Sequence, residues 1–560
     1  MAITGSGGSG AVTAGLILLR AAARSGYYAL MNRSAGPQIR GGESAAMVRF
    51  GSRPVACMDD RFDVLVGLDW LNAERFVDEI PVDENSLVLA DPEAGEVPAF
   101  LLSNGASVHR VGFKELAATV AGGRLNMAAL GAVGRFCGLP RAALDDAVAG
   151  ILSAKGEAVT RAASACIALG YAEDVQSVMA LPAQDTGPDE VWDISGNEAC
   201  GLGALRGGVR FVAAYPITPA TEMLEWMAPR LEQLGGSLLQ AEDELASVNM
   251  VIGASFGGVP SATATSGPGL SLMIEGLGLA VASETPAVVV NVMRGGPSTG
   301  IPTKSEQSDL NIALYGLHGD APHLVLAPLS IADCAFTTQW AVRLAEHLQT
   351  VAIVLSDQSL GQSRSVTDAP AEPVLPLERR EEHSPQDDYH RYALAADGIS
   401  PMTFPGIPGG MYTADGLEHD EQGTPSSLAA DHHRQMEKRR RKIDDFDYGE
   451  SWSEVSGEGP LCLVTWGSTS GAVVEAAARL RDRGLAVRVV ALRLIAPLQR
   501  ERLASLFEGA RELWVLEQNH SGQLFHYLHS LEALPPNSHF LAHPGPLPVR
   551  PGDIVETINQ

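Results

Sequence analysis

The sequence has few cysteines, and no two of them lie close together. The six cysteines of this 560-residue chain are Cys57, Cys137, Cys166, Cys200, Cys334 and Cys462. This spacing argues against a disulfide framework and favours a reduced, cytoplasmic protein. No CxxC pair occurs, so an iron–sulfur cluster of the ordinary close-spaced kind is not expected on this chain.

Positive charge and long apolar runs are also scarce. The chain carries 40 Lys and Arg against 67 Asp and Glu, a formal net charge of −27. This balance argues against binding to nucleic acid or to an anionic membrane surface, because both require clustered positive charge. No uncharged apolar run reaches the roughly 18 residues of a membrane-spanning helix, and the first residues lack the basic segment of a secretory signal.

The composition that remains is typical of a packed protein with several domains. Hydrophobic residues make up 45% of the chain, and its length predicts roughly two to four domains. Strand-like apolar runs alternate with helical patterns through most of the sequence. This alternation predicts an α/β fold class, with three α/β domains.

The first domain is predicted at residues 1–180, with a mostly parallel sheet. Its expected elements are a helix at Ala11–Ser25 and strands at Ala2–Thr4, Tyr27–Asn32, Ala45–Phe50 and Asp63–Leu68. The polar, acidic stretch at 181–197 is predicted to be a linker.

The second domain is predicted at residues 198–365. Its expected strands are Val209–Ala214, Ser261–Thr265, Ala287–Val292, His323–Ala327 and Val351–Leu355. Continuous apolar strands of this kind predict a parallel sheet that is covered on both faces.

Regular periodicity is lost over residues 366–455, which we expect to form an irregular connecting region. The basic run KRRRK at 438–442 lies near its end, and we expect it to be a solvated helix face rather than a nucleic-acid site. A third, small α/β domain is predicted at 456–560. Its expected elements are a helix at Ser470–Arg483 and strands at Leu461–Thr465, Ala486–Leu492 and Leu513–Glu517.

The first glycines match the pattern GxGxxG, as Gly5, Gly7 and Gly10. A dinucleotide site also requires an acid at the end of the second strand, to hold the ribose hydroxyls. Here that strand ends in Asn-Arg-Ser at 32–34, and the first carboxylate after it is Glu43. We therefore expect a tight strand-to-helix turn, suited to a phosphate-bearing ligand, rather than a nicotinamide site.

Several polar residues follow the predicted strands of the second domain. Thr218 lies in Tyr-Pro-Ile-Thr-Pro, directly after an apolar strand, at the edge where open α/β folds bind ligands. The alternative is that Thr218 only caps the next helix. Glu242 lies in Gln-Ala-Glu-Asp-Glu at another strand-to-helix junction, where acids ordinarily complement the helix dipole.

Two further turns extend this pattern. Ser266 and Gly267 lie in Thr-Ser-Gly-Pro-Gly after a strand, in a turn whose backbone can approach a ligand closely. Arg294 follows the next strand and begins a glycine-rich loop, where a guanidinium can bind a carboxylate through two hydrogen bonds. Such features at one sheet edge together indicate an active site.

Four of these segments resemble the alpha subunit of 2-oxoacid:ferredoxin oxidoreductases. They are YPITPATE at 215–222, QAEDELA at 240–246, ATATSGPGLSLM at 262–273 and NVMRGGPSTGIPTKSEQSDL at 291–310. The glycine turn at 5–10, with IRGGE at 39–43, resembles the gamma domain of this family, fused ahead of alpha. Residues 397–423 resemble its connecting region, and residues 461–520 resemble a transketolase C-terminal-like domain.

The resemblance implies roles for individual residues. Glu242 matches the glutamate that hydrogen-bonds the aminopyrimidine ring of thiamine diphosphate, which favours loss of the thiazolium C2 proton before decarboxylation. Pro219, Ser266 and Gly267 match other cofactor-binding positions. Thr218, Arg294 and Thr303 match positions that hold the 2-oxoacid, with Arg294 on its carboxylate.

The resemblance also implies a partner. No GDG segment is present to anchor Mg²⁺ and the diphosphate, and no cysteine set could hold a [4Fe–4S] cluster. Both groups are expected on a beta subunit, in a dimer of alpha–beta units that transfers electrons to ferredoxin and uses coenzyme A as acyl acceptor. No metal ligand is expected on this chain.

The fused gamma–alpha arrangement resembles enzymes that act on 2-oxoglutarate. Three alternatives stay open: the same chemistry on pyruvate or a branched-chain 2-oxoacid, a non-redox thiamine-dependent enzyme, and a non-catalytic role in which the first domain binds a nucleotide or coenzyme A.

Overall fold

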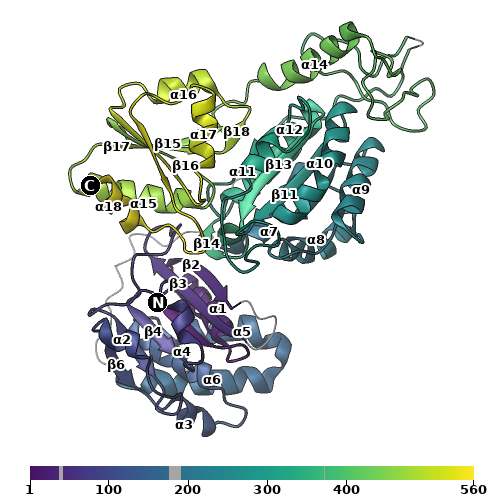
Figure 1. Cartoon of the computed structure of the whole chain (residues 1–560). Coiled ribbons are helices and arrows are strands. Elements are labelled where there is room, and N and C mark those ends of the chain that lie inside the picture. The colour runs from purple at the N-terminus through teal and green to yellow at the C-terminus, as the bar shows by residue number, and fades with distance from the viewer. Residues whose placement is uncertain (37–41, 176–190, 371, 387, 560) are drawn as a thin grey trace. The chain divides into compact units, whose positions relative to one another are not determined.

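The computed structural model of the chain describes residues 1–36, 42–175, 191–370, 372–386 and 388–559. Positions 39–41 of the IRGGE motif and 181–190 of the predicted linker lie outside the described residues. The chain forms two compact units (Figure 1). The first comprises Met1–Ser195, Gln362–Pro370 and Leu547–Gln560, and the second comprises Gly196–Gly361 and Ala371–Pro546. Within the described segments, no helix combines the length and hydrophobicity that crossing a bilayer requires.

An eight-stranded sheet forms the centre of the first unit. Its spatial order is β6 (Ser107–Arg110), β5 (Leu87–Ala90), β4 (Val64–Gly67), β1 (Ala2–Ser6), β3 (Glu43–Gly51), β2 (Tyr28–Ala35), β14 (Arg364–Asp368) and β7 (Val191–Ser195). Strands β1, β4, β5 and β6 are parallel, whereas β3, β2, β14 and β7 join through antiparallel pairs. The prediction of a mostly parallel sheet is therefore wrong for this half. Its physical reason is the short β2–β3 connection, which makes a hairpin and leaves no room for a crossover helix.

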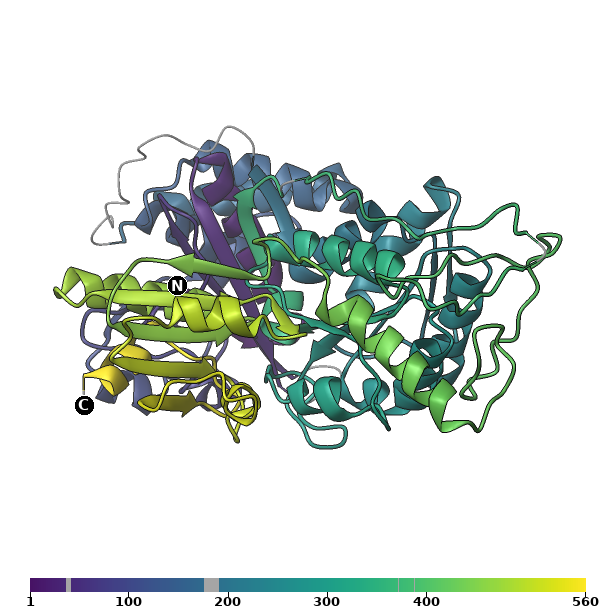
Figure 2. The same cartoon turned by 90° about the horizontal axis from the view of Figure 1, so that it is seen from above.

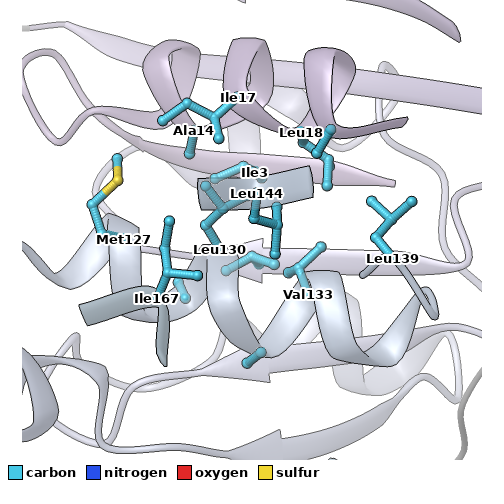
Figure 3. Packing of buried hydrophobic residues seen from close by; sticks show 14 of the residues in the cluster. Ile3, Ala14, Ile17, Leu18, Met127, Leu130, Val133, Leu139, Leu144 and Ile167 are labelled. Atoms are coloured by element: carbon cyan, nitrogen blue, oxygen red, sulfur yellow. The ribbon is translucent and has the colours of Figure 1, made fainter. Parts of the chain in front are cut away.

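Helices cover this sheet. They are α1 (Ala11–Arg24), α2 (Ala99–Ser103), α3 (Phe113–Ala118), α4 (Leu125–Phe136), α5 (Arg141–Leu152), α6 (Glu157–Ala172) and α18 (Pro551–Ile558), with short 3₁₀ turns at Ala73–Phe76 and Ser153–Lys155. Figure 3 shows the core, in which Ile3 of β1 and Ile17 of α1 pack with Leu130, Leu144 and Ile167 from α4, α5 and α6. Burying one such side chain contributes about 1.5–3 kcal/mol.

Two glycines let the backbones of α4 and α6 touch. A side-chain carbon added at Gly131 would lie 2.2 Å from the carbonyl oxygen of Ile167, and one added at Gly170 would lie 1.8 Å from that of Ala128. No real side chain tolerates such distances. These positions therefore require glycine for packing, although glycine lowers helix stability by itself.

A seven-stranded sheet forms the centre of the second unit. Its order is β18 (Leu494–Ala496), β12 (Leu324–Leu326), β13 (Val351–Asp357), β11 (Ala287–Met293), β10 (Ser261–Thr265), β8 (Phe211–Ala214) and β9 (Ser237–Gln240). All neighbours are parallel except β12 and β18. Every residue of β10, β11 and β13 is buried. The predicted parallel sheet, covered on both faces, is confirmed.

The helices packed around this sheet are α7 (Gly196–Gly207), α8 (Thr221–Gln233), α9 (Glu244–Phe256), α10 (Gly267–Ala282), α11 (Leu310–Tyr315), α12 (Asp333–Leu348) and α13 (Gln358–Gly361). Helix α7 begins inside the stretch predicted as a linker, and β7 precedes it directly. Residues 191–197 are therefore regular structure, because Val191–Ser195 pairs with β14.

A five-stranded sheet completes the second unit. Its order is β15 (Ser453–Ser456), β17 (Val487–Leu492), β16 (Leu461–Trp466), β19 (Glu512–Glu517) and β20 (Ser538–Ala542), with helices α15 (Thr469–Asp482), α16 (Arg500–Leu506) and α17 (Gln523–Ser530). The elements predicted for the third domain are confirmed, each to within two residues.

Most of the connecting region lacks helices and strands, as predicted, but it contains one long helix. Figure 2 shows green loops that lead into α14 (Ala429–Asp444). The prediction that the basic run on this helix is a solvated face is wrong. Lys438 and Lys442 are buried, and their ammonium groups lie 2.7 Å and 2.8 Å from the carboxylate oxygens of Glu284. Glu284 follows α10, and its distance along the sequence hides the pairing.

Candidate functional site

The carboxyl ends of four neighbouring strands carry the predicted site residues. Strands β11, β10, β8 and β9 lie side by side in this order, and they are followed by Arg294, Ser266, Thr218 and Glu242. Neighbouring strands lie about 4.8 Å apart. Strand order therefore places these four turns in one row, along the sheet edge where open α/β folds bind ligands.

Arg294 contacts the turn that holds Thr218. Its Nη1 donates a hydrogen bond to the carbonyl oxygen of Thr218 at 2.5 Å, across 76 residues of sequence. The side chain is only 8% exposed, and its Nε has no hydrogen-bond partner in the described part of the chain. Burial lowers the pKa of Arg294, and the nearby Asp309 carboxylate opposes this shift. A buried guanidinium with a free donor is suited to hold an anion.

Thr218 does not cap the following helix. Ala220 occupies the capping position of α8, and the peptide between Thr218 and Pro219 is cis. The carbonyl oxygen of Pro219 accepts a hydrogen bond from Nδ2 of the buried Asn197 at 2.9 Å. This fixes the turn and leaves the Thr218 side chain exposed. The capping alternative is therefore wrong.

Two adjacent acids at the start of α9, Asp243 and Glu242, have different roles. The Asp243 side chain caps the helix and accepts a hydrogen bond from the backbone N–H of Ala246 at 2.7 Å. Glu242 precedes the cap, is exposed, and has no hydrogen bond or ion pair within the described segments. Asp243 thus complements the helix dipole, and the Glu242 carboxylate remains available to a ligand.

Ser266 and Gly267 lie where β10 meets α10. Ser266 is fully buried, and its hydroxyl has no partner among the residues that the structure describes. A side-chain carbon at Gly269 would lie 2.6 Å from the Glu244 carboxylate. The turn can therefore pack against Glu244 of α9 because position 269 is glycine. The Ser266 hydroxyl, without a partner among the described residues, lies at the start of the turn.

Thr303 is half-buried in the loop that follows Arg294. The loop folds back on itself, since the backbone N–H of Gly295 donates to Lys304 O at 3.0 Å and that of Ile301 donates to Gly295 O at 2.7 Å. Thr303 thus belongs to the same loop as Arg294, but no hydrogen bond joins it to Arg294 or Thr218 among the residues that the structure describes.

Sequence reasoning missed Asp309 and Asn291. Asn291 lies on β11, is fully buried, and donates from Nδ2 to Oδ2 of Asp309 at 2.9 Å. Burial raises the pKa of Asp309 to about 6. The signal that could have found them is a lone amide in the apolar strand AVVVNVM, because a fully buried polar side chain needs a partner.

The glycine turn of the first unit joins β1 to α1, as predicted. Gly8 and Gly10 are left-handed, with φ of 94° and 88°. The Ser6 backbone N–H and hydroxyl both donate to Oδ2 of Asp69 at 2.8 Å. The tight strand-to-helix turn is thus confirmed. At its start, the Asp69 carboxylate of the same unit accepts the hydrogen bonds from Ser6.

A cavity of about 670 Å³ lies elsewhere in the second unit. Its lining includes Tyr315, His433, Met436 and Arg440, and it contains none of the predicted site residues. Within the described ranges, no group of three or more His, Cys, Asp or Glu side chains is arranged to hold a metal ion.

Comparisons with known proteins match all three parts of the sequence. The family described as "Pyruvate flavodoxin/ferredoxin oxidoreductase, thiamine diP-bdg" matches residues 202–439. "Pyruvate ferredoxin/flavodoxin oxidoreductase" matches residues 1–173, and "Transketolase, C-terminal domain" matches residues 452–522. These matches agree with the gamma-type, thiamine-diphosphate-binding and transketolase C-terminal-like domains expected from the sequence.

Individual relatives are also subunits of 2-oxoacid oxidoreductases by name. The chain is 36% identical over 345 residues to the 2-oxoglutarate synthase subunit KorA of Methanothermobacter marburgensis, covering 60% of this chain and 90% of that protein. It is 29% identical over 584 residues to the 2-oxoacid:ferredoxin oxidoreductase subunit alpha of Saccharolobus solfataricus, covering 93% and 91%.

A solved structure matches along the whole chain. It is a 2-oxoglutarate:ferredoxin oxidoreductase from Magnetococcus marinus with 2-oxoglutarate, coenzyme A and succinyl-CoA bound, at a TM-score of 0.91 and 35% identity, covering 100% of this chain and 98% of that one. The chain therefore belongs to the alpha subunits of the 2-oxoacid:ferredoxin oxidoreductase family.

Proposed function

We propose that this chain is the alpha subunit of a 2-oxoglutarate:ferredoxin oxidoreductase. The complex would convert a 2-oxoacid and coenzyme A to an acyl-CoA and CO₂, reversibly, and pass the electrons to ferredoxin. The observation that carries the proposal is the contact of Arg294 with the Thr218 turn, in the same row of strand ends as Glu242. The relatives whose names include 2-oxoglutarate support the choice of substrate.

In this proposal Arg294 binds the substrate carboxylate. Its Nη1 is held by the carbonyl oxygen of Thr218, while Nε has no partner in the part of the chain that the structure describes. The exposed Thr218 hydroxyl and the half-buried Thr303 would hold the rest of the reacting end. Fixing the carboxylate places the keto carbon in one orientation, which lowers the barrier to attack on it.

The residues beside Arg294 fit the aminopyrimidine end of thiamine diphosphate. The Glu242 carboxylate is unpaired among the described residues and would accept a hydrogen bond from a ring nitrogen. The Ser266 hydroxyl, which has no partner among the described residues, would be a second polar group at this end, and Gly267 lies against the Asp309 carboxylate. When bound, thiamine diphosphate supplies the carbon nucleophile and the electron sink for decarboxylation.

A partner subunit is required to complete this site. Glu242 is exposed in the isolated chain, although a carboxylate that acts on a cofactor ring is more effective when water is excluded. The apolar side chains nearby on α9 and α10 are exposed as well: Leu245 at 48%, Met250 at 40% and Leu272 at 48%. Exposed apolar side chains around a site are typical of a surface that another chain covers.

That partner would be a beta subunit that carries the Mg²⁺–diphosphate site and the [4Fe–4S] cluster, in a dimer of alpha–beta units. Ferredoxin would accept the electrons. A cytoplasmic location fits the dispersed cysteines of this chain, which form no disulfide pattern in the sequence.

The test is coenzyme-A-dependent reduction of a viologen dye by the chain co-expressed with its beta subunit, across a panel of 2-oxoacids. We expect activity with 2-oxoglutarate that is lost in Glu242→Ala and retained in Asp243→Ala. Preferred activity on pyruvate or a branched-chain 2-oxoacid would change the substrate but keep the chemistry. An iron-replete complex that reduces no dye with any 2-oxoacid would overturn the proposal and favour a non-redox thiamine enzyme.

A further inference from the structure

Glu306 lies in the loop that carries Arg294 and Thr303, and the proposed function gives it no role. The residue is half-buried. Its carboxylate accepts two backbone hydrogen bonds, one at each oxygen. Oε2 accepts from the N–H of Gly296 at 3.3 Å, and Oε1 accepts from the N–H of Gly545 at 3.1 Å. One side chain therefore joins the first turn of this loop to the last segment of the second unit.

The bond to Gly296 closes the base of the loop beside Arg294. Gly296 comes two residues after Arg294, and the N–H of the intervening Gly295 donates to Lys304 O at 3.0 Å. Both bonds cross from one side of the loop to the other. The turn that they close, residues 296–302, is exposed. An exposed turn is thus held at its base, next to the guanidinium that the proposed function assigns to the substrate.

The far side of the loop is fixed to the sheet through Ser305. Its Oγ donates to Oδ1 of the fully buried Asp357 at 3.2 Å. Asp357 is the last residue of β13 and lies opposite Met293 of β11 in the parallel register. Glu306 therefore follows backbone that is fixed at the strand ends, and its carboxylate can hold Gly296 in a defined place.

The contact with the 543–546 segment depends on glycine at position 545. A side-chain carbon there would lie 2.8 Å from the carbonyl oxygen of Ser305 and 3.5 Å from Cβ of Glu306. The segment reaches the loop this closely because Gly545 has no side chain. Its N–H gives the second carboxylate oxygen a donor of its own, and hydrogen bonds to an ionised acceptor are stronger than those between neutral groups.

We propose that Glu306 is a positioning residue for the 2-oxoacid site: its carboxylate holds the base of the loop, so that Arg294 and Thr303 meet the substrate in a fixed arrangement. This inference rests on the proposed function. Without the carboxylate, the exposed turn moves about its base, and the substrate has to order it on binding. The apparent affinity then falls with the fraction of complexes whose loop is ordered. Loss of Glu306 therefore weakens substrate binding more than it slows the chemistry.

Limited proteolysis of the assembled alpha–beta complex tests the loop without any need for activity. Trypsin can cleave after Lys304 when the loop opens, since the next residue, Ser305, is buried and bonded to the sheet. Glu306→Gln keeps the size of the side chain but leaves one acceptor oxygen for two N–H groups. We expect cleavage at Lys304, identified by mass spectrometry, to be at least about tenfold faster in Glu306→Gln. Glu501→Gln, at an exposed position of α16, is the matched control and should match wild type.

Steady-state kinetics of the same complexes tests the substrate role. Glu306→Gln should raise the KM for 2-oxoglutarate about fivefold and keep kcat within about twofold of wild type. A purely structural role would instead lower the amount of active complex, and so kcat, at an unchanged KM. Gly545→Ala disturbs the same contact from its other side and should reproduce both effects. Glu306→Asp keeps both acceptor oxygens and should lie between Glu306→Gln and wild type.

The two measurements separate this inference from the proposed function. Equal cleavage and equal KM in Glu306→Gln and wild type would overturn the inference alone. Faster cleavage at an unchanged KM would also overturn it, because the loop would then be held without effect on the substrate. A raised KM at unchanged cleavage would show that Glu306 does not act through the loop. A wild-type complex that turns over no 2-oxoacid would overturn the proposed function, and the substrate role of Glu306 with it.

Discussion

Gln307 and Gln518 hold each other through two hydrogen bonds. The backbone N–H of Gln307 donates to the carbonyl oxygen of Gln518 at 2.7 Å, and the N–H of Gln518 donates to Oε1 of Gln307 at 2.7 Å. Gln307 Nε2 also donates to the carbonyl oxygen of Trp466 at 2.8 Å. The loop that carries Arg294 is thereby fixed to the strand ends of the five-stranded sheet.

Replacing Gln307 by Met should loosen this loop. The change removes the hydrogen bond that the buried N–H of Gln518 donates to Oε1 and one of the two that the carbonyl oxygen of Trp466 accepts, at a cost of about 1–3 kcal/mol. We expect a lower urea midpoint and a KM for the 2-oxoacid that rises about tenfold, because Arg294 loses its fixed position. Gln233→Met, at an exposed position, is the matched control. A normal KM despite the lower midpoint would restrict Gln307 to a role in stability.

Variants of the adjacent acids Glu242 and Asp243 should affect different properties, activity for Glu242 and stability for Asp243. Glu242→Gln is expected to lower kcat at least 100-fold, without a change in the thermal midpoint, because its carboxylate has no partner within the described segments. Asp243→Ala removes the α9 cap and should cost about 1 kcal/mol while keeping activity. Steady-state kinetics and thermal unfolding of both variants test this pair. The opposite pattern would reverse the two roles.

Glu284 should be essential for stability. Its carboxylate is fully buried between the ammonium groups of Lys438 and Lys442. Burial by itself would raise the pKa of Glu284, but the two lysines outweigh this and hold it below the usual range. Glu284→Gln leaves buried cations uncompensated, so we expect a loss of about 3–5 kcal/mol in urea unfolding. The surface variant Glu437→Gln on α14 should show no measurable change.

The same cluster predicts a rise of stability with pH. Burial lowers the pKa of Lys438 to about 7; the positive charges of Arg391 and Lys442 add to this shift, and the Glu284 carboxylate opposes it. Between pH 7 and pH 9 the unfolded chain keeps the lysine proton while the folded chain loses it, so the free energy of unfolding increases with pH. Lys438→Met should flatten this slope by about 1 kcal/mol per pH unit. Urea unfolding at pH 7, 8 and 9 measures it; parallel slopes would contradict the assignment.

Gly170→Ala should destabilise the first unit by about 1–3 kcal/mol, because the added carbon would clash with the backbone of α4. Gly150→Ala is the control. It lies in α5, and the nearest atom to an added carbon is 3.9 Å away, so better helix propensity should leave stability equal or slightly higher. Thermal unfolding compares the two. Equal midpoints would mean that α4 and α6 can move apart freely.

The sequence was most informative where each strand is continuous and apolar. The parallel strands of the second unit and the turns after them were predictable, because periodicity and turn residues are local signals. The part of the antiparallel half that β14 builds was not predictable, since β14 reaches it from residues 364–368 and no local pattern reveals that pairing. The proposed roles of all the predicted site residues stay predictions: Thr218, Pro219, Glu242, Ser266, Gly267, Arg294 and Thr303.

Pairings between polar residues far apart in the sequence were the other feature that could not be predicted. The basic run on α14 is like a solvated helix face in composition, and only its pairing with Glu284, 154 residues away from Lys438, makes it buried. Asn291 on β11 and Asp309, 18 residues later and directly before α11, form a second such pair. The pairing of Glu284 with Lys438 leaves no local mark in the sequence, whereas the lone amide in AVVVNVM is a local signal for the second pair.

The first unit is assembled from three separate stretches of the chain. Its strand β14 is translated after most of the seven-stranded sheet, and its helix α18 is translated after the five-stranded sheet. There Arg550 Nη2 donates to Glu79 O at 2.8 Å, and the N–H of Gly552 donates to Oδ1 of Asp60 at 2.7 Å. A nascent chain leaving the ribosome thus exposes an unfinished sheet edge beside β2 until residues 364–368 emerge. The sheet of residues 1–195 is thus completed only after residues 364–368 have been synthesised.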